Sequence, residues 1–438
     1  MLTRAFSSCA TTKDTVNILY VSQYYPPEMG APAARAAELA KHWASTGHAP
    51  TVLTGFPNHP TGRVPKEWRS RFLRLRYREM LDGVRVERTW LWPLPNRKAI
   101  ERALNYGSFC ISAALAGMLL PTPDIVIGTS PQLLVGLSAW WIARIKRVPF
   151  VFEVRDLWPE SLVAVGMGDS NSLLHRTLGR IAGFLYSRAT RIVVVTPAFK
   201  DHLIKYWSIA PGKISVVENG VETDLFQPST DFGSIRKELG IEQKFLVCYV
   251  GTMGWAHGLE TLIETAAQLY SQSPSVHFLL IGEGADKERI KALARERKLA
   301  NLTFLDQQPR ECIPGYISAS DACLVLLRKT DVFKTVIPTK MLEFMSCERP
   351  LILAVDGQAR SIVEDAQAGL FVEPEDSKAI AGAILQLAAN PDLRRQLGRN
   401  GRDYIVNKFS RKQTAGAYVK VLEEVLSQEH ENPNRAPH

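Results

Sequence analysis

The stretch "VIPTKMLEFMSCERP" places a lysine and a glutamate at the start of a predicted helix. Thr339 is a plausible N-cap, and Lys340 and Glu343 are three positions apart, so they share one face of the helix. A helix N-terminus binds phosphate through its free N–H groups and its dipole. Lys340 would add a point charge there, and Glu343 would accept hydrogen bonds from two ribose hydroxyls. The pattern favours a nucleotide site, and an exposed salt bridge between the two side chains is the alternative.

Two similar halves of the chain supply the elements that must position such a site. Each half opens with an apolar strand, a glycine-containing turn, a helix and a second strand, at 17–54 and again at 244–284. Most of the predicted strands are apolar throughout, which is typical of buried parallel strands. The pattern predicts an α/β fold of two Rossmann-like, doubly wound domains that face each other across a cleft, with ligands at the carboxyl ends of the strands.

The two halves meet in a turn-rich stretch at 219–232, which we take as the domain boundary. The predicted units are a flexible tail at 1–15, an N-terminal domain at 16–222, a C-terminal domain at 223–405, a C-terminal helix at 406–427 that packs back toward the N-terminal domain, and a tail at 428–438. Neither glycine turn reads G-x-G-x-x-G, so a dinucleotide site is not specifically indicated.

Composition and spacing argue against several kinds of site. The 438 residues include six cysteines. None of them has C-x-x-C or ligand-like Cys/His spacing, so we expect neither a zinc site nor a disulfide framework. There is no Asp-x-Asp sequence, and we expect no metal and no cofactor. Residues 1–14 lack an apolar core of signal-peptide length, which fits a cytoplasmic protein.

The net charge of +9 is concentrated in one part of the chain. From Arg63 to Arg102 there are twelve Lys/Arg and five Asp/Glu, and Ala103–Pro123, which follows, has no charged residue. Because a basic face beside an apolar helix attracts anionic lipid, we expect peripheral association with an anionic membrane surface. A membrane-spanning helix and a solvated arginine face beside a core helix are the alternatives. No nucleic-acid-binding motif is present, so we expect no nucleic acid partner.

Several motifs together resemble those of GT-B glycosyltransferases of the large retaining family four, over about residues 16–427. They are "YYPPEMGAPAARAAELAKHWASTGHAPTVLTGFPNHPTG", the junction "VVENGVETDLF" with Glu222 where the family has Asp, and "IGEG" before a helix. "FVFEVRDLWPES" and "YVGTMGWAHGLETLIE" are similar to a branch that builds bacterial surface polysaccharides and includes enzymes resembling the N-acetyl-fucosamine transferase WbuB. The resemblance implies an N-terminal acceptor-binding domain and a C-terminal nucleotide-sugar-binding domain.

On the donor side, the resemblance transfers residue by residue with gaps. The family has two glutamates eight positions apart; Glu343 matches the second, the ribose ligand, and Thr335 stands where the first would be. The Arg and Lys that the family often has in the first turn of the C-terminal domain are absent here. The expected donor-binding residues are therefore Gly30, Thr252, His257, Glu283, Arg328, Lys329, Lys340 and Glu343. Their alternatives are a tight turn at Gly30, a helix cap at His257 and a solvated strand end at Arg328–Lys329.

On the acceptor side, charged residues follow the apolar strand 149–154 directly. We expect Asp156 to contact an acceptor hydroxyl and Arg155 to contact a phosphate, as the residues nearest the chemistry. Asn58, His59 and Glu160 are the expected acceptor-binding residues. An ion pair between Arg155 and Glu160, and an incidental loop histidine at His59, are the alternatives.

The resemblance implies front-face transfer with retention of configuration and without a metal. The expected donor is a nucleotide sugar, UDP-linked, with an N-acetylated deoxyhexosamine as one candidate sugar. The expected acceptor is a polyprenyl-diphosphate-linked saccharide of O-antigen or capsule synthesis, at the cytoplasmic face of the inner membrane. The alternatives are a soluble acceptor, a GT-B epimerase and an inactive relative, because Thr335 replaces a glutamate.

Overall fold

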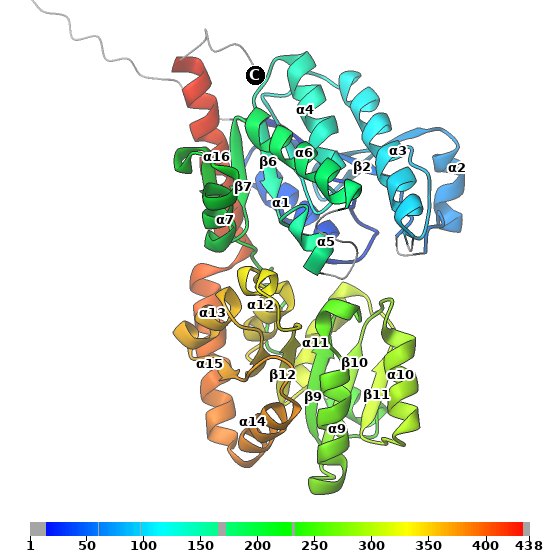
Figure 1. Cartoon of the computed structure of the whole chain (residues 1–438), viewed down its shortest axis with the longest axis vertical. Helices are drawn as coiled ribbons and strands as arrows, with labels where there is room; N and C mark the ends of the chain where they lie inside the picture. Colours follow the sequence, from blue (N-terminus) through cyan, green and yellow to red (C-terminus); the bar gives the residue numbers. More distant parts are fainter. Residues whose placement is uncertain (1–14, 60, 97, 165–171, 230–232, 432–438) are drawn as a thin grey trace, which may run out of the picture.

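The computed structural model describes residues 15–59, 61–96, 98–164, 172–229 and 233–431. This part of the chain folds into two α/β domains, one above the other in Figure 1. The parallel, largely buried strands predicted from the apolar runs are present in both domains, and the two-domain architecture is confirmed.

The N-terminal domain contains an eight-stranded sheet in the order β3-β4-β2-β1-β5-β6-β7-β8, in which only the pair β3–β4 is antiparallel. Its strands are β1 Asn17–Val21, β2 Ala49–Gly55, β3 Arg76–Leu81, β4 Val84–Thr89, β5 Ile125–Thr129, β6 Phe150–Val154, β7 Arg191–Val194 and β8 Ile214–Val216. Its helices are α1 Ala31–Ser45, α2 Arg69–Phe72, α3 Ala99–Met118, α4 Leu134–Lys146, α5 Glu160–Ala164, α6 Leu173–Arg188 and α7 Pro197–Trp207.

The C-terminal domain contains a six-stranded parallel sheet in the order β11-β10-β9-β12-β13-β14. Its strands are β9 Phe245–Val250, β10 Val276–Ile281, β11 Leu302–Leu305, β12 Ala322–Leu326, β13 Leu351–Ala354 and β14 Gly369–Phe371. Its helices are α8 Gly233–Glu238, α9 Glu260–Gln272, α10 Lys287–Glu296, α11 Ile313–Ala319, α12 Thr339–Ser346, α13 Gln358–Ala366, α14 Ser377–Ala389 and α15 Pro391–Lys408.

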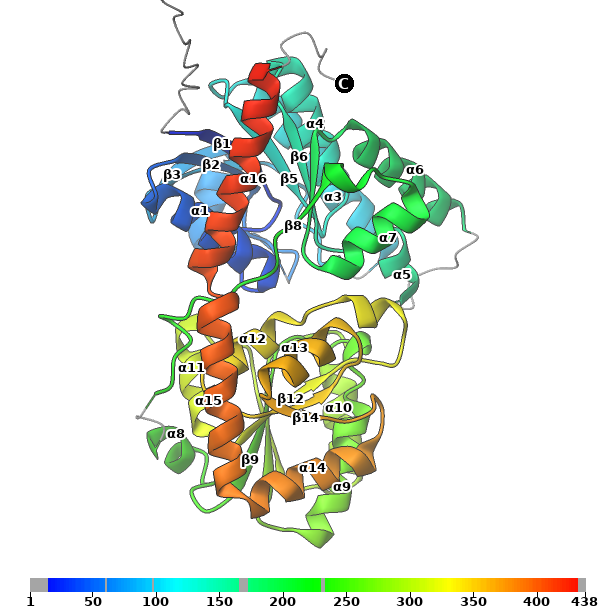
Figure 2. The ribbon, with the colours of Figure 1, turned by 90° about the vertical axis from the view of Figure 1, so that its left-hand side faces the viewer.

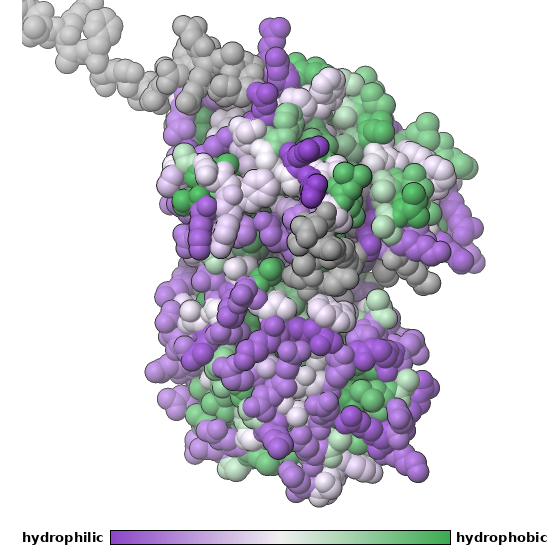
Figure 3. Space-filling view, viewed as in Figure 1, coloured by the Kyte–Doolittle hydropathy of each residue, from purple (hydrophilic) through white to green (hydrophobic). Residues whose placement is uncertain are grey.

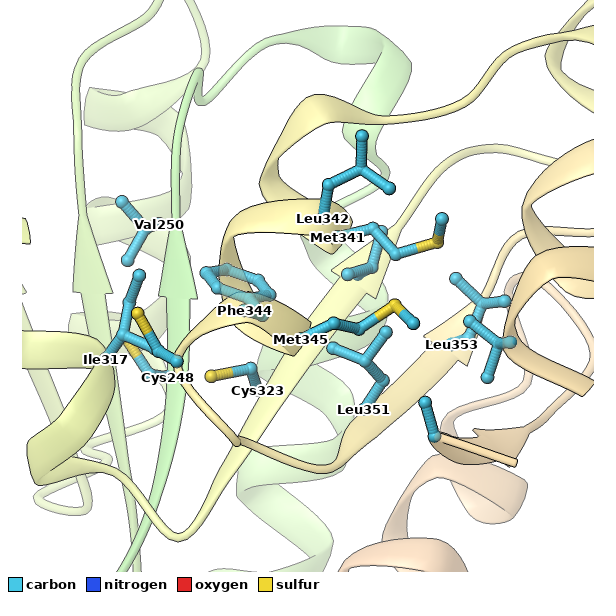
Figure 4. Close-up of a cluster of buried hydrophobic side chains, with 14 of the residues drawn as sticks. Cys248, Val250, Ile317, Cys323, Met341, Leu342, Phe344, Met345, Leu351 and Leu353 are labelled. Atoms are coloured by element: carbon cyan, nitrogen blue, oxygen red, sulfur yellow. The ribbon is translucent and has the colours of Figure 1, made fainter. Parts of the chain in front are cut away.

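Helix α12, which contains Lys340 and Glu343, is fixed to the sheet through its other face. Met341, Phe344 and Met345 are fully buried in a cluster that includes residues of β9, β12 and β13 (Figure 4). The spacing i, i+3, i+4 explains why one helix face enters the core. The helix begins at Thr339, with Pro338 at the N-cap position, so the prediction of Thr339 as the N-cap is wrong by one residue.

Helix α16, Arg411–Glu431, begins at the domain boundary where α15 ends, lies along the N-terminal domain and packs on α1 (Figure 2). The Trp43 and Tyr418 rings meet edge to face at 5.3 Å between centroids. The helix predicted at 406–427 is in fact divided: α15 ends at Lys408, and Ser410 pairs with Val221 of the domain junction in an isolated bridge. This pairing interrupts the helical hydrogen bonding between α15 and α16.

Helix α3 carries the uncharged segment and leaves an apolar stripe on the surface. Ile111 and Leu115, which are 66% and 56% exposed, lie one turn apart, and Ile100, Leu104 and Leu119 continue the exposed series. Figure 3 shows hydrophobic residues gathered over the part of the N-terminal domain where α3 and α4 lie. Within the ranges that the structure describes, no helix is long and apolar enough to cross a membrane.

Candidate active site

The carboxyl ends of the two parallel sheets meet at the domain boundary. Thr196, two positions after the end of β7, donates from Oγ1 to the carbonyl of Thr335 in the loop after β12, at 2.9 Å. Arg155 and Asp156 follow β6, and Lys340 lies in the first turn of α12. The main candidates from both domains therefore lie on facing edges, as the doubly wound pattern predicted.

Lys340 has a buried ammonium group with no hydrogen-bond partner among the residues that the structure describes. Its Nζ lies 4.0 Å from the ring centroid of Tyr249 and beneath the turn after β9, where a Cβ built on Gly251 would be 2.9 Å from it. Burial lowers the pKa of Lys340 to about 7. Because an unpaired ammonium is costly to bury, this group marks a place where an anion can bind.

Glu343 is 12% exposed, and the salt bridge with Lys340 that was the alternative to a nucleotide site does not form. Its Oε1 accepts a hydrogen bond from Nη1 of Arg310 at 3.0 Å, and Nη2 of Arg310 donates to Glu38 of α1 at 2.6 Å. Burial raises the pKa of Glu343, and the neighbouring Arg310 opposes that rise. The carboxylate predicted to hold a ribose is therefore connected to the N-terminal domain through an arginine.

Two glycine turns shape the space in front of β9. A Cβ on Gly282 would lie 2.0 Å from the carbonyl oxygen of Gly251, and a Cβ on Gly284 would lie 2.2 Å from that of Met253. The backbone of Glu283 also accepts a hydrogen bond from the Met253 N–H at 2.8 Å. The "IGEG" turn is thus required for close approach of two loops, with backbone φ values that favour glycine.

The other donor-side candidates have protein partners. His257 faces the carbonyl of Leu326 through Nδ1 at 3.4 Å, and desolvation lowers its pKa to about 3, so its ring is neutral at neutral pH. Thr252 is exposed in the turn after β9. The remaining charged candidates are held in ion pairs: Arg328 with Glu260 and Glu375, Lys329 with Glu373, and Glu283 with Lys287.

Arg155 lies beside the start of α1. Its Nη2 is 3.4 Å from the carbonyl oxygen of Ala31, while its Nε and Nη1 are buried without hydrogen-bond partners in the described chain. Gly30, with φ 128°, is the N-cap position of α1, and no side chain caps that helix end. A guanidinium with two unused donors next to an uncapped helix N-terminus is suited to a phosphate group.

Asp156, next to Arg155, is half-buried. Burial raises the pKa of Asp156 to about 6, against the lowering effect of Arg155. The alternative ion pair between Arg155 and Glu160 does not form, because Glu160 lies 3.2 Å from Nε2 of His202 instead. That contact lowers the pKa of Glu160 in spite of its partial burial.

Asn58 and His59 are positioned by an acid that the sequence analysis did not single out. Oε1 of Glu28 accepts the backbone N–H groups of both residues at 2.9 Å, and its Oε2 is buried without a partner within the described residues. Burial raises the pKa of Glu28 to about 7. The Asn58 side chain accepts a hydrogen bond from Asn105 and is buried, whereas His59 is exposed and packs edge to face on Tyr24.

Sequence reasoning missed three residues that hold the candidates: Glu28, Glu38 and Arg310. Glu28 stands in "YYPPEMG", where it is the charged residue of the loop between β1 and α1, and Arg310 stands in "DQQPREC", in the loop that follows β11. Glu38 shows no such signal, because a glutamate in the middle of an amphipathic helix is usually solvated. Its role depends on a contact with Arg310 across 272 positions.

Comparison with known proteins assigns both domains. Residues 30–220 match the family described as "Glycosyl transferase 4-like domain", and residues 231–404 match the family described as "Glycosyl transferases group 1". Escherichia coli (strain K12) WcaI, named as a colanic acid biosynthesis glycosyl transferase, is 24% identical over 396 residues, which cover 86% of this chain and 93% of WcaI.

Solved structures share the fold. Sucrose-phosphate synthase from Thermosynechococcus elongatus superposes with a TM-score of 0.75 and 21% identity, over 95% of this chain and 100% of that chain. Anabaena HepE in complex with UDP-glucose superposes with a TM-score of 0.71 and 17% identity, over 93% of this chain and 100% of that chain. The two family matches together span most of the chain and identify it as a glycosyltransferase with a 4-like N-terminal domain, and the likeness to these structures shows that its fold is of the GT-B type.

Proposed function

We propose that the protein is a retaining glycosyltransferase that uses a UDP-sugar donor, with an N-acetylated deoxyhexosamine as one candidate sugar. The acceptor in this proposal is a polyprenyl-diphosphate-linked saccharide of bacterial surface polysaccharide synthesis, such as O-antigen or capsule. One observation carries it: each domain places a buried cation with unused donors at the boundary, Arg155 on one side and Lys340 on the other. The UDP-glucose complex of HepE and the naming of WcaI support the donor and the pathway class.

In this mechanism the diphosphate leaving group is stabilised by fixed positive charge. Lys340 and Arg155, together with the N-terminus of α1 at Gly30, would hold its oxygens, and Glu343 would accept the ribose hydroxyls. The departing phosphate takes the proton of the acceptor hydroxyl as the new glycosidic bond forms on the same face of the sugar. Asp156 orients that hydroxyl, for which it must be ionised, and it is ionised above about pH 6.

Thr335 stands at the position of the family's first glutamate and has no carboxylate to offer the donor sugar. Its Oγ1 donates to the carbonyl of Val332 at 2.6 Å within the same turn. This substitution is what favours a second candidate function, a relative that binds the nucleotide sugar without transferring it. If the protein transfers the sugar, the donor site also includes the other expected donor-binding residues, which the ion pairs and turns hold in place: Thr252, His257, Glu283, Arg328 and Lys329.

The surface of the N-terminal domain supports a lipid-linked acceptor. The exposed stripe of α3 is continued by Trp92, which is 51% exposed and whose carbonyl accepts a hydrogen bond from Asn105 of α3. Leu73 and Leu75 are exposed after α2, on either side of the exposed Arg74. Apolar side chains beside basic ones fit the interface of an anionic membrane, which is where a polyprenyl-linked saccharide is held. A soluble acceptor leaves this surface without a purpose.

A panel of UDP-, GDP- and dTDP-sugars tests the proposal. We expect slow hydrolysis of one UDP-sugar by the protein alone, and faster release of UDP when a polyprenyl-diphosphate-linked saccharide is added. Binding of UDP without any turnover across the panel would favour the non-transferring relative. Equal acceleration by the saccharide without its lipid would favour a soluble acceptor.

A further inference from the structure

Four charged side chains from both domains and the terminal helix form a continuous row. Arg411 of α16 donates from Nε to Oε2 of Glu38 at 2.8 Å, and Arg310 donates to Oε1 of Glu38 at 2.6 Å. The other end of the Arg310 guanidinium donates to Oε1 of Glu343 at 3.0 Å. Arg310 thus bridges a carboxylate of the N-terminal domain and the donor-side carboxylate of the C-terminal domain.

The guanidinium of Arg310 is held in place by more than its two carboxylates. It lies over the Phe226 ring at 4.9 Å from the centroid, and its side chain is 31% exposed. A planar fork that reaches two carboxylates at once is a geometry that lysine cannot reproduce. Among the described residues, Arg310 is the hydrogen-bond partner of Glu343, through Oε1 only, which leaves Oε2 for a ligand.

We propose that Arg310 is a positioning residue for the donor, which fixes the Glu343 carboxylate in the orientation that accepts the ribose hydroxyls. This inference rests on the proposed function, in which Glu343 is the ribose ligand. A protonated carboxyl would lose one of its acceptor oxygens, because the O–H becomes a donor. Arg310 therefore acts through Glu343 and makes no contact with the ribose itself.

The charges that face Glu343 make the effect dependent on pH. Arg310 and Lys340 favour its ionised form, whereas burial and the nearby Glu38 favour the neutral form, and the Cys347 thiol is also close. Without Arg310, Lys340 would be the remaining cation, and Lys340 itself loses its proton near pH 7. Loss of Arg310 should therefore raise the pKa of Glu343 further, so a larger fraction of Glu343 is protonated as pH falls and UDP affinity should fall with it.

The test compares UDP affinity by calorimetry from pH 5.5 to 8.5 in the full-length wild type, Arg310→Met and Arg310→Lys. Because Lys340 titrates in all three proteins, the quantity to examine is the ratio of dissociation constants, variant to wild type. For Arg310→Met we expect a ratio of about 3 at pH 8.5 that rises above about 10 at pH 6. For Arg310→Lys, which keeps the charge but not the fork, we expect a small ratio of about 2 to 3 at every pH.

Arg236→Met is the matched control, since Arg236 also pairs with a carboxylate, Asp321, at 2.6 Å, but at the amino end of β12. It should lower stability without changing the pH dependence of UDP binding. If Arg310→Met does not fold, Arg310→Gln replaces it. A ratio for the neutral variant that stays constant with pH would overturn the proposal, because a purely structural arginine predicts that result. Unchanged UDP affinity in Glu343→Ala would instead show that the donor assignment itself is wrong.

Discussion

Replacing Lys340 by methionine should make the folded protein more stable and the donor site weaker. Methionine has a similar length and no charge, and the site is buried against Tyr249. A pKa of about 7, compared with 10.5 for an ordinary lysine, corresponds to about 4 kcal/mol of lost stability at pH 7.5. The cation–π contact with Tyr249 stabilises the wild type by about 1 to 2 kcal/mol and is lost in the variant. We therefore expect the free energy of unfolding of Lys340→Met to exceed that of the wild type by about 2 to 3 kcal/mol.

The size of this stability difference depends on pH. Below pH 7 both the folded and the unfolded chain bind the Lys340 proton, so the full electrostatic cost is present in the wild type. Between pH 7 and 10.5 the unfolded chain binds more protons, so the stability of the wild type approaches that of Lys340→Met as pH rises. Urea denaturation at pH 6.5, 7.5 and 9.5 measures this convergence, provided that the m-values of both proteins agree.

The same variant separates the diphosphate from the nucleoside. Loss of a buried charge that pairs with phosphate should weaken UDP binding by about 10- to 100-fold, and uridine binding by less than about threefold. Calorimetry with both ligands provides the comparison. A variant that is less stable than the wild type at pH 6.5, or that weakens UDP and uridine equally, would refute the assignment of Lys340 to the diphosphate.

Three further predictions concern the surface, the metal and the acceptor. The protein should bind vesicles with anionic lipid at low salt through the exposed Arg69 and Arg74 and the α3 stripe. The double variant Arg69→Gln/Arg74→Gln and the addition of 1 M salt should each weaken this binding several-fold, and the double variant should hydrolyse the donor as fast as the wild type. Binding that neither salt nor these substitutions affect would contradict a surface role. Activity should survive excess EDTA if Lys340 and Arg155 supply the positive charge at the diphosphate, as proposed; loss that Mg²⁺ or Mn²⁺ reverses would contradict this. Asp156→Asn should lower kcat by about 100-fold with UDP affinity unchanged, and the wild-type rate should fall below about pH 6 as Asp156 takes up a proton; a wild-type rate that is level from pH 5 to 8 would argue against Asp156.

The architecture was predictable because hydrophobic patterning determines it. Largely apolar runs such as 150–154 and 276–281, which are interrupted by Glu153 and His277, became fully buried parallel strands in two sheets. Strand β3, Arg76–Leu81, was not predicted, because its arginines alternate with aromatic and aliphatic residues and suggested only a basic surface. It pairs antiparallel with β4 at the sheet edge, where Arg76 and Arg78 meet Glu87, so half-exposed charged residues form a strand there.

The candidate site was predictable in its elements and less so in its contacts. The helix spacing placed Lys340 and Glu343 on one face, but the partner of Glu343 comes from another loop, 33 positions away. The prediction that Arg328 and Lys329 bind phosphate used only their charge. In the structure both side chains are held in ion pairs with glutamates, and these pairs could not be predicted because they depend on tertiary packing. A pairwise contact between distant loops leaves no periodic signal in a single sequence.

The most direct test measures the anomeric configuration of the transferred sugar and the dependence of the transfer rate on Arg155. The protein is incubated with the UDP-α-sugar that it hydrolyses and with a polyprenyl-diphosphate-linked saccharide, and NMR follows the anomeric signal of the product. We expect an α-linked product, with equimolar release of UDP, and at least about a 100-fold lower rate for Arg155→Met, because that guanidinium supplies part of the charge that stabilises the leaving group. A β-linked product, or an Arg155→Met variant as active as the wild type, would contradict the central claim.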